Sequence, residues 1–267
     1  MDVTMAETSG EYSAEHFVCH EIIWGEGWMS QGGEDEVASV VQGLDLSGKT
    51  VLDIGSGLGG PSVALAANHN PGQVISIDIQ AEQSALAQKL ATRRGVTERI
   101  TYQVVEPGPF PFEGASFDVV FSVGVFLQIH TKQSLYDDIY RVLKPGGTAM
   151  IGLYATYSTM FLWYRFRSIL GGSLSKAESD RWMNNNTEGE WQTEGRQNHW
   201  TKTYSKPEFT EMMARAGFDK VQMKQTPQQI KTIPLLGKVV RALLPAAVGD
   251  LRVGPFGGML VATSIKI

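Results

Sequence analysis

The sequence contains very little cysteine: Cys19 is the only one in 267 residues. A disulfide within the chain and a zinc site built from several thiolates are therefore excluded. The chain also lacks a basic excess, because its net charge is −5 and its Lys and Arg residues are scattered, so we expect no nucleic-acid partner. A single cysteine fits a reducing compartment, and we expect a cytoplasmic protein.

The N-terminal stretch lacks the apolar core of a signal peptide, since it is acidic and polar. The longest stretch without a charge runs from Pro145 to Tyr164 and approaches the length of a membrane span. It opens with Pro-Gly-Gly and contains several Thr and Ser residues, so a strand, a loop and the start of a helix explain it better. We therefore expect no stable insertion into a membrane.

Short apolar runs alternate with helical patterns, which indicates an α/β protein whose parallel strands are joined by crossover helices. The predicted strands span residues 49–54, 74–79, 100–105, 117–123, 148–153, 221–225 and 259–265. The predicted helices span residues 61–67, 81–94, 132–143, 158–170 and 206–216. We expect the Lys-Pro-Gly-Gly sequence at 144–147 to close the third of these helices.

A glycine-rich turn follows the first predicted strand, in the order Gly55-Ser56-Gly57-Leu58-Gly59-Gly60. Glycine allows positive φ angles and lets the backbone approach a ligand closely. The helix that follows presents its first backbone amides to whatever lies on the turn. We interpret this segment as a cofactor-binding turn, and a tight turn without a ligand is the alternative.

Two acidic residues near the turn distinguish between classes of cofactor. Asp53 lies two residues before the first glycine, which suits the cationic amino-acid end of S-adenosylmethionine better than a pyrophosphate. Asp78 ends the second predicted strand, where an acidic side chain reaches ribose hydroxyls in either class. An NAD-dependent enzyme is therefore the less favoured alternative.

In combination, these motifs resemble those of the class I S-adenosylmethionine-dependent methyltransferases. The resemblance covers residues 45–155 and rests on Asp53–Gly59, Asp78, Glu106, Phe117–Val120 and Leu143–Gly147. It resumes from Tyr204 to Phe218. It implies a Rossmann-like fold, with a mostly parallel seven-stranded sheet and helices on both faces. It also implies S-adenosylmethionine as methyl donor and S-adenosylhomocysteine as product.

The resemblance further implies which residues contact the cofactor. Gly55, Ser56 and Gly57 would line the methionine portion, and Asp78 and Ile79 would meet the ribose and adenine. Glu106 stands where the family usually has an Asp that accepts from the adenine amino group. Ser122 and Val123 would contribute backbone near the methionine end. The other expected contacts are Asp53, Gly59, Gln80 and Pro107.

Residues 12–33 are similar to the lid of phosphoethanolamine N-methyltransferases. In that family a Tyr closes over the methyl donor, and an Ile-Ser pair before Gly-Gly contacts the cofactor. Tyr12, Met29 and Ser30 fall at the corresponding places. The tryptophans, glycines and Met in this segment also suit an adaptable apolar flap. Ordinary packing of an N-terminal helix on the sheet is the alternative.

The resemblance breaks where the acceptor would bind. The family has an Asp and a His after the fourth strand, whereas this chain has Gly124 and Gln128. Without that Asp a cationic amine loses its counter-charge, so we do not expect phosphoethanolamine as the acceptor. The catalytic candidates are His130, whose imidazole suits a base near neutral pH, Tyr12, and Gln128 in place of the missing His.

The expected acceptor is a small, fairly apolar molecule, such as a natural product or a lipid-like compound, methylated on oxygen or nitrogen. The segment Met160–Phe166 fits core packing best, and lining an acceptor pocket is the alternative. C-methylation and a catalytically silent cofactor-binding partner protein stay open as further alternatives. We expect a monomer or homodimer without a metal ion.

We expect one methyltransferase domain over residues 1–267. It would comprise an N-terminal lid (1–45), a cofactor-binding core (46–155), an inserted cap (156–203) and the C-terminal end of the sheet (204–267). The cap is expected because residues 173–203 are polar and interrupt the alternation of strands and helices.

Overall fold

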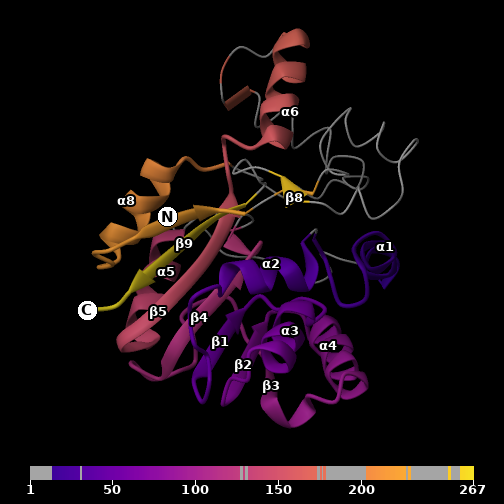
Figure 1. Ribbon diagram of the computed structural model, residues 1–267, viewed down its shortest axis with the longest axis vertical. Coiled ribbons are helices and arrows are strands. Elements are labelled where there is room, and N and C mark those ends of the chain that lie inside the picture. Colours follow the sequence, from indigo (N-terminus) through magenta and orange to yellow (C-terminus); the bar gives the residue numbers. More distant parts are fainter. Residues whose placement is uncertain are drawn as a thin grey trace.

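The computed structural model describes residues 14–30, 32–126, 129, 132–172, 175, 177–178, 203–226, 228–229, 252–253 and 259–267. Figure 1 shows a central sheet with helices on both sides and with α6 projecting beyond it. The helices are α1 (Ala14–Trp24), α2 (Gly33–Val40), α3 (Gly60–Asn68), α4 (Ala81–Arg93), η1 (Thr97–Arg99), α5 (Lys132–Val142), α6 (Thr159–Leu170) and α8 (Lys206–Arg215). The strands are β1 (Thr50–Ile54), β2 (Gln73–Asp78), β3 (Ile100–Val104), β4 (Phe117–Val123), β5 (Leu143–Tyr154), β6 (Gln222–Gln225), β7 (Gln228–Gln229), β8 (Arg252–Val253) and β9 (Met259–Ile265).

The central sheet has seven strands in the order β3-β2-β1-β4-β5-β9-β6. The first five are parallel, and β9 is antiparallel to both of its neighbours. The fold expected from the sequence, with a mostly parallel seven-stranded sheet, is thereby confirmed. Because the strand order reverses between β1 and β4, the loops that follow these two strands meet at the switch point where open α/β sheets bind ligands.

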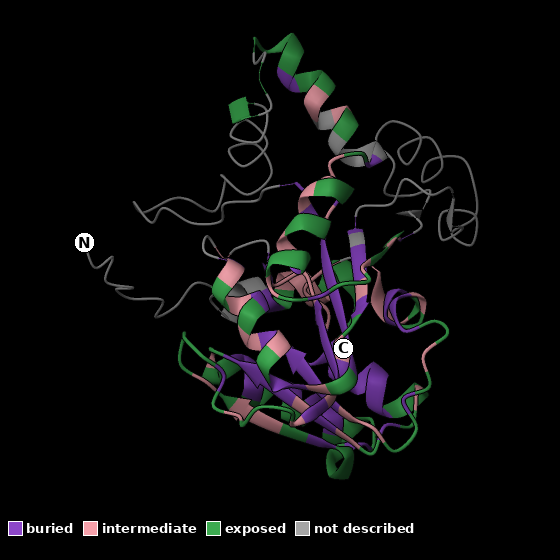
Figure 2. Ribbon diagram, turned by 90° about the vertical axis from the view of Figure 1, so that its left-hand side faces the viewer, coloured by how far each residue is buried: buried purple, intermediate pink, exposed green. Residues whose placement is uncertain are grey.

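The two faces of the sheet bury separate cores. Along β1, Leu52 and Ile54 join a cluster that includes side chains of α5 and α8, whereas Val51 joins a cluster that includes side chains of α2, α3 and α4. This follows from the alternation of side chains along a strand. Figure 2 shows the result as a buried sheet between helices whose outer sides are exposed.

The fifth strand begins earlier than the sequence predicts. The Lys-Pro-Gly-Gly turn lies within β5, because Phe117 pairs with Leu143 and Val119 pairs with Thr148 on either side of a register shift. The C-terminal segment holds the extra residues in place: the Gly146 amide donates to the Lys266 carbonyl at 2.7 Å, and the Lys266 amide donates to the Gly147 carbonyl at 2.9 Å. The turn is therefore a bulge of the sheet and not a loop before it.

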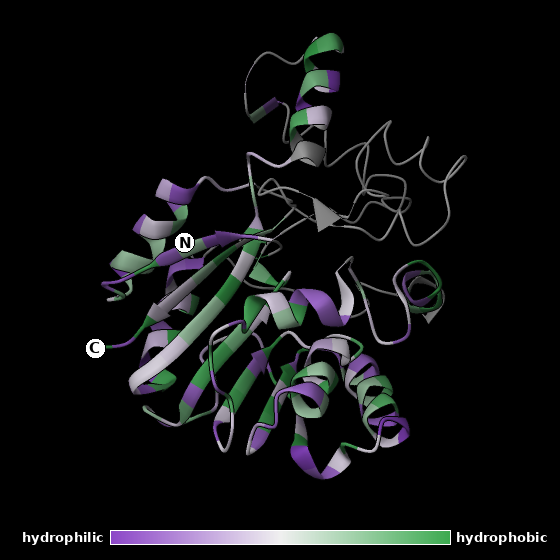
Figure 3. Ribbon diagram, in the orientation of Figure 1, coloured by the Kyte–Doolittle hydropathy of each residue, from purple (hydrophilic) through white to green (hydrophobic). Residues whose placement is uncertain are grey.

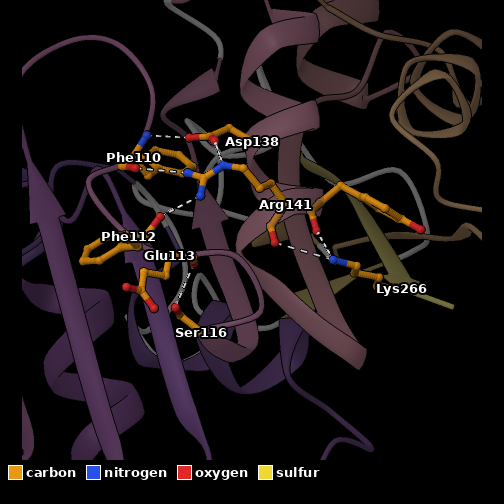
Figure 4. A network of polar contacts seen from close by, with 8 residues as sticks. Phe110, Phe112, Glu113, Ser116, Asp138, Arg141 and Lys266 are labelled. Carbon is orange, nitrogen blue, oxygen red and sulfur yellow. Dashed lines mark hydrogen bonds and ion pairs between the residues drawn. The ribbon is translucent and has the colours of Figure 1, made fainter.

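A network of polar contacts fastens the end of α5 to its surroundings (Figure 4). The Arg141 guanidinium donates to the carbonyl oxygens of Phe112 at 2.6 Å and Phe110 at 3.0 Å, and it pairs with Asp138 at 2.6 Å. The Lys266 ammonium donates to the Tyr140 carbonyl in the last turn of α5 and to the Leu143 carbonyl just after the helix, at 2.8 Å each. Cations at this end of a helix satisfy its last carbonyls and favour its dipole.

The remaining predicted elements lie close to their expected positions. α8 begins with a capping box, in which Ser205 and Glu208 each bond the other's backbone amide. The stretch from Pro145 to Tyr164 divides between β5, a short connection and the start of α6, as expected. Within the described ranges, no helix is long and apolar enough to cross a membrane. Most of the predicted cap lies outside the described residues, and the division of the chain into lid, core and cap stays a prediction.

Candidate cofactor-binding site

The glycine-rich turn connects β1 to α3 and adopts a conformation that requires its glycines. Gly55, Gly57 and Gly59 have φ angles of 68°, 52° and 89°. A Cβ at Gly55 would lie 2.2 Å from a methyl group of Val125, and a Cβ at Gly59 would lie 2.6 Å from the Cβ of Ala87. The three positions therefore need glycine both for the backbone and for the space beside it.

Asp78 holds this turn from the end of the neighbouring strand β2. One carboxylate oxygen accepts from the Gly57 amide at 2.8 Å, and the other accepts from the Gln80 amide at 3.0 Å. Burial raises the pKa of Asp78, and the hydrogen bonds from Gln80 and Gly57 oppose this rise. Because a carboxylate oxygen has two lone pairs, each oxygen can also accept from a ligand hydroxyl.

Further predicted residues gather around this carboxylate. Ser56 is buried, and its hydroxyl has no hydrogen-bond partner among the residues that the structure describes. Ile79 follows Asp78 and is 42% exposed although it is apolar. Glu106 is exposed just beyond β3, where the Val105 amide donates to the Asp78 carbonyl at 2.9 Å. An orphaned hydroxyl, a carboxylate and an uncovered apolar side chain fit a ligand that combines polar groups with an aromatic ring.

Ser122 and Val123 end β4 beside the turn. The Ser122 hydroxyl is fully buried and donates to the Ile54 carbonyl at 3.1 Å. Its side chain therefore joins β4 to β1. The backbone groups of Ser122 and Val123 are left for the predicted contact with the methionine end of the cofactor. Pro107 is exposed after β3, and Gln80 is half-buried at the start of α4.

Asp53 lies beneath the turn and faces α3. It is 2% exposed, and it accepts a hydrogen bond of 2.5 Å from the Ser62 hydroxyl, which lies 3.0 Å from the Ser76 hydroxyl. Burial raises the pKa of Asp53 to about 7, the Ser62 hydrogen bond opposes this rise, and the nearby Asp78 charge adds to it. The sequence reasoning missed Ser62 and Ser76. Its expectation that Asp53 contacts the cofactor's amino-acid end stays a prediction.

The N-terminal segment after α1 packs directly on the glycine turn. The Gly60 amide donates to the Gly27 carbonyl at 2.9 Å, and a Cβ at Gly60 would lie 2.8 Å from the Trp28 ring. The Met29 sulfur would lie 2.9 Å from a Cβ at Gly57. This packing brings Met29, with Ser30 after it, to the glycine turn, and their contact with the cofactor stays a prediction.

An ion pair of 2.7 Å between Glu26 and Arg93 ties the same segment to α4. A second pair, between Glu34 of α2 and Arg94, spans 2.5 Å. Both pairs are about half exposed, so each contributes little to stability by itself. The two ion pairs connect the N-terminal segment to the C-terminal end of α4.

The three catalytic candidates, Tyr12, Gln128 and His130, lie outside the described residues. A feature that the sequence reasoning missed follows Gln128 and His130 closely in the sequence. Lys132, at the start of α5, is only 6% exposed; its ammonium donates to the Ile129 carbonyl and lies 5.3 Å from the centre of the Tyr204 ring. A cation over an aromatic ring is a stabilising arrangement, and here it joins α5 to the segment before α8.

Comparison with known proteins agrees with this geometry. Residues 52–151 match the family model of the methyltransferase domain. Over these residues the chain is similar to methyltransferase domains, and its fold is that of the class I methyltransferases. The domain spans the glycine turn, Asp78 and the ends of β3 and β4, which are the elements that build the candidate site.

Several relatives of this methyltransferase domain act on chemically different acceptors according to their names. The chain is 30% identical over 145 residues to a phosphoethanolamine N-methyltransferase of Triticum aestivum, a match that covers 54% of this chain and 28% of that protein. It is 35% identical over 132 residues to an arsenite methyltransferase of Halobacterium salinarum, covering 44% of this chain and 34% of that protein. The matched part is thus about a third or less of the length of these relatives.

Among solved structures, phosphoethanolamine N-methyltransferase 2 of Haemonchus contortus, in complex with S-adenosylmethionine, superposes with a TM-score of 0.68. The two chains are 21% identical, and the superposition covers 97% of this chain and 58% of that one. At this identity the likeness establishes the fold. The resemblance to the phosphoethanolamine N-methyltransferases that the sequence indicates is thereby confirmed at the level of fold and domain.

Proposed function

We propose that this protein binds S-adenosylmethionine at the glycine turn and transfers its methyl group to an oxygen or nitrogen of a small, fairly apolar molecule. The observation that carries the proposal is the Asp78 carboxylate, which holds the Gly57 amide beside the orphaned Ser56 hydroxyl. The resemblance to class I methyltransferases implies that this end of the sheet would carry the methyl donor. The solved Haemonchus complex with S-adenosylmethionine has the same fold, which supports the choice of cofactor.

The residues present fit this cofactor. Asp78 would accept from the ribose hydroxyls, Ile79 would cover one side of the adenine, and Glu106 would accept from its amino group. The turn would receive the methionine portion, with the Ser56 hydroxyl donating to its carboxylate. When bound, the cofactor supplies an electrophilic methyl group on a sulfonium, and the chain's task is to align the acceptor with it and to exclude water.

The lid segment would exclude water from the reacting groups. Its contact with the glycine turn, through Gly27 and Met29, brings apolar atoms over the methionine end of the proposed site. Apolar cover excludes the water that would compete with the acceptor. Tyr12 and His130 stay the candidates for removing a proton from a hydroxyl acceptor, with Gln128 as a hydrogen-bonding group.

The acceptor is not expected to be phosphoethanolamine. Gly124 stands where the related enzymes have an Asp, and no atom of the described residues lies within 4 Å of a Cβ built there. A cationic amine would therefore find no counter-charge at this position. Neutral oxygen or nitrogen acceptors avoid that cost.

Calorimetric titration with S-adenosylhomocysteine tests the cofactor site. We expect saturable binding by the wild type, and loss of binding in Asp78→Ala and in Gly57→Val. Asp219→Ala, which removes an exposed carboxylate after α8, serves as the matched control and should bind normally. A folded wild-type protein that does not bind would refute the proposal. Binding without turnover across a screen of apolar hydroxyl and amine compounds would favour the catalytically silent alternative.

A further inference from the structure

Helix α6 presents an apolar face to solvent. Leu162, Phe166, Ile169 and Leu170 are between 43% and 72% exposed. Their spacing of i, i+4, i+7 and i+8 places them on one side of the helix, while Ser168 on the opposite side is fully buried. The sequence pattern favoured core packing for the first part of this helix, and the exposure of Leu162 and Phe166 contradicts that interpretation for these two side chains.

The position of α6 makes this face accessible. Figures 1 and 2 both show the helix projecting away from the sheet, and in Figure 2 much of its surface is coloured as exposed. In Figure 3 the end of α6 farthest from the sheet is strongly hydrophobic, in contrast to the mixed colouring of the exposed helix surfaces around the sheet. Four large exposed apolar side chains along one side of a projecting helix form the kind of patch that marks an interaction surface.

The charges of α6 are all positive. Arg165 and Arg167 lie on the two flanks of the apolar face, and they are the only charged residues between Lys144 and Lys176. No Asp or Glu occurs between Asp138 and Glu178, although the whole chain has a net charge of −5. Arg165 donates to the Ser175 carbonyl at 3.2 Å, and the Ser175 amide donates to the Glu178 carboxylate at 2.8 Å, so one acidic side chain approaches this flank. The helix itself carries only positive charge beside its apolar face.

This combination favours an anionic lipid surface over a second copy of the chain. A symmetric pairing of two α6 faces would bring the arginines of both copies together, and α6 has no acidic side chain to separate them. At a bilayer, by contrast, apolar side chains enter the acyl boundary while flanking arginines reach the anionic headgroups. Trp163, whose ring centre lies 6.0 Å from that of Phe166, adds an aromatic residue of the kind enriched at membrane interfaces.

We propose that the exposed face of α6, formed by Leu162, Phe166, Ile169 and Leu170 with Arg165 and Arg167 beside it, binds reversibly to the surface of membranes rich in anionic lipid. The helix lies in the interface and does not cross it, since its 12 residues are too few for a span. This binding is independent of the proposed methyl transfer. It would hold the protein at the surface where lipid-like molecules are concentrated.

Co-sedimentation of the full chain with vesicles tests the proposal. The probes are vesicles of phosphatidylcholine containing phosphatidylserine and vesicles of phosphatidylcholine alone, each at low and at high salt. We expect binding to the first kind, much weaker binding to the second, and weakening by salt. Arg165→Gln with Arg167→Gln should lower the partition coefficient on anionic vesicles about 30-fold at low salt. Phe166→Ser with Leu170→Ser should lower it by about tenfold or more.

Two matched double variants control for loss of charge and of apolar surface elsewhere. Lys89→Gln with Lys220→Gln removes two exposed cations, and Leu86→Ser with Ile267→Ser removes two exposed apolar side chains far from α6. Both should bind like the wild type, and circular dichroism melting should show that every variant is folded.

Three results would overturn the proposal. One is the absence of wild-type binding to anionic vesicles. Another is equal binding by the wild type and the α6 variants. The third is a dimer in sedimentation that Phe166→Ser with Leu170→Ser converts to a monomer, because the face would then be an interface between copies. None of these measurements requires the cofactor, so they fail or succeed separately from the methyltransferase proposal.

Discussion

The buried carboxyl group of Asp53 should make the stability of this fold fall as pH rises through the acidic range. Its folded-state pKa is raised by burial to about 7, from an ordinary value of 3.8, with the Ser62 hydrogen bond opposing the rise. Between these values the folded chain retains a proton that the unfolded chain has released. The protonated Asp53 carboxyl group therefore stabilises the folded chain fully when the pH is below the pKa of the unfolded state. This contribution is lost as the pH rises through the pKa of the folded state.

The size of the effect follows from the shift. Each pKa unit corresponds to about 1.4 kcal/mol, so a rise from 3.8 to about 7 lowers the free energy of unfolding by about 4 kcal/mol over this pH interval. Asp53→Asn keeps the shape of the side chain and an oxygen that can accept from Ser62, but it does not ionise. Relative to the wild type, the variant should therefore gain about 4 kcal/mol of stability between about pH 4 and about pH 8.

Urea unfolding followed by tryptophan fluorescence at a series of pH values measures this difference. Asp118→Asn is the control. Burial alone would raise the pKa of Asp118, but the hydrogen bonds from the Thr50 amide and Lys144 outweigh it and lower this pKa overall. The ionised Asp118 carboxylate stabilises the fold, and this contribution is lost only as the pH falls through the lowered pKa. The difference in unfolding free energy between Asp118→Asn and the wild type should therefore stay constant near neutral pH. If Asp53→Asn follows the wild-type profile at every pH, the reasoning from burial is wrong.

Three further changes test other contacts. Gly60→Ala, whose Cβ would lie 2.5 Å from the Gly27 carbonyl, should weaken S-adenosylhomocysteine binding about tenfold or more in calorimetry, whereas Gly114→Ala meets only ordinary contacts and should bind normally. Lys266→Met should lower the free energy of urea unfolding by about 1–3 kcal/mol, because it leaves carbonyls at the end of α5 without a donor; an unchanged value would contradict the capping role. Tyr136→Phe removes a buried hydroxyl without a partner among the described residues and should be neutral or stabilising by about 1 kcal/mol; a large loss of stability would show that the hydroxyl is satisfied.

The glycine turn could be predicted because its signals are local. Gly55, Gly57 and Gly59 follow one another at alternate positions, and glycine suits the positive φ angles and the close packing found there. The strand that precedes it is an uninterrupted apolar run, and the order of strands and helices fixes which strand ends meet at the switch point. The sequence placed Asp78 at the end of β2 and assigned it to the ribose hydroxyls, and its hydrogen bond with the Gly57 amide was not foreseen.

The support beneath the turn could not be predicted in the same way. Asp53 lies on the side of β1 that faces α3, so its partner is Ser62, and Ser76 of β2 lies beside that hydroxyl. Nothing in the spacing of these three residues marks them as one polar group. Two serines at otherwise apolar, buried positions were the available signal, but its meaning depends on which helix covers that face of the sheet.

Contacts between segments that are distant in the sequence could not be predicted either. Lys132 finds the Tyr204 ring 72 positions later, a pairing that no local pattern encodes. The helical spacing of Leu162, Phe166 and Leu170 is the same whether the face meets the core or the solvent, so periodicity alone favoured the commoner outcome. A cofactor common to a whole family can thus be inferred from short motifs, whereas the acceptor depends on how separate segments come together.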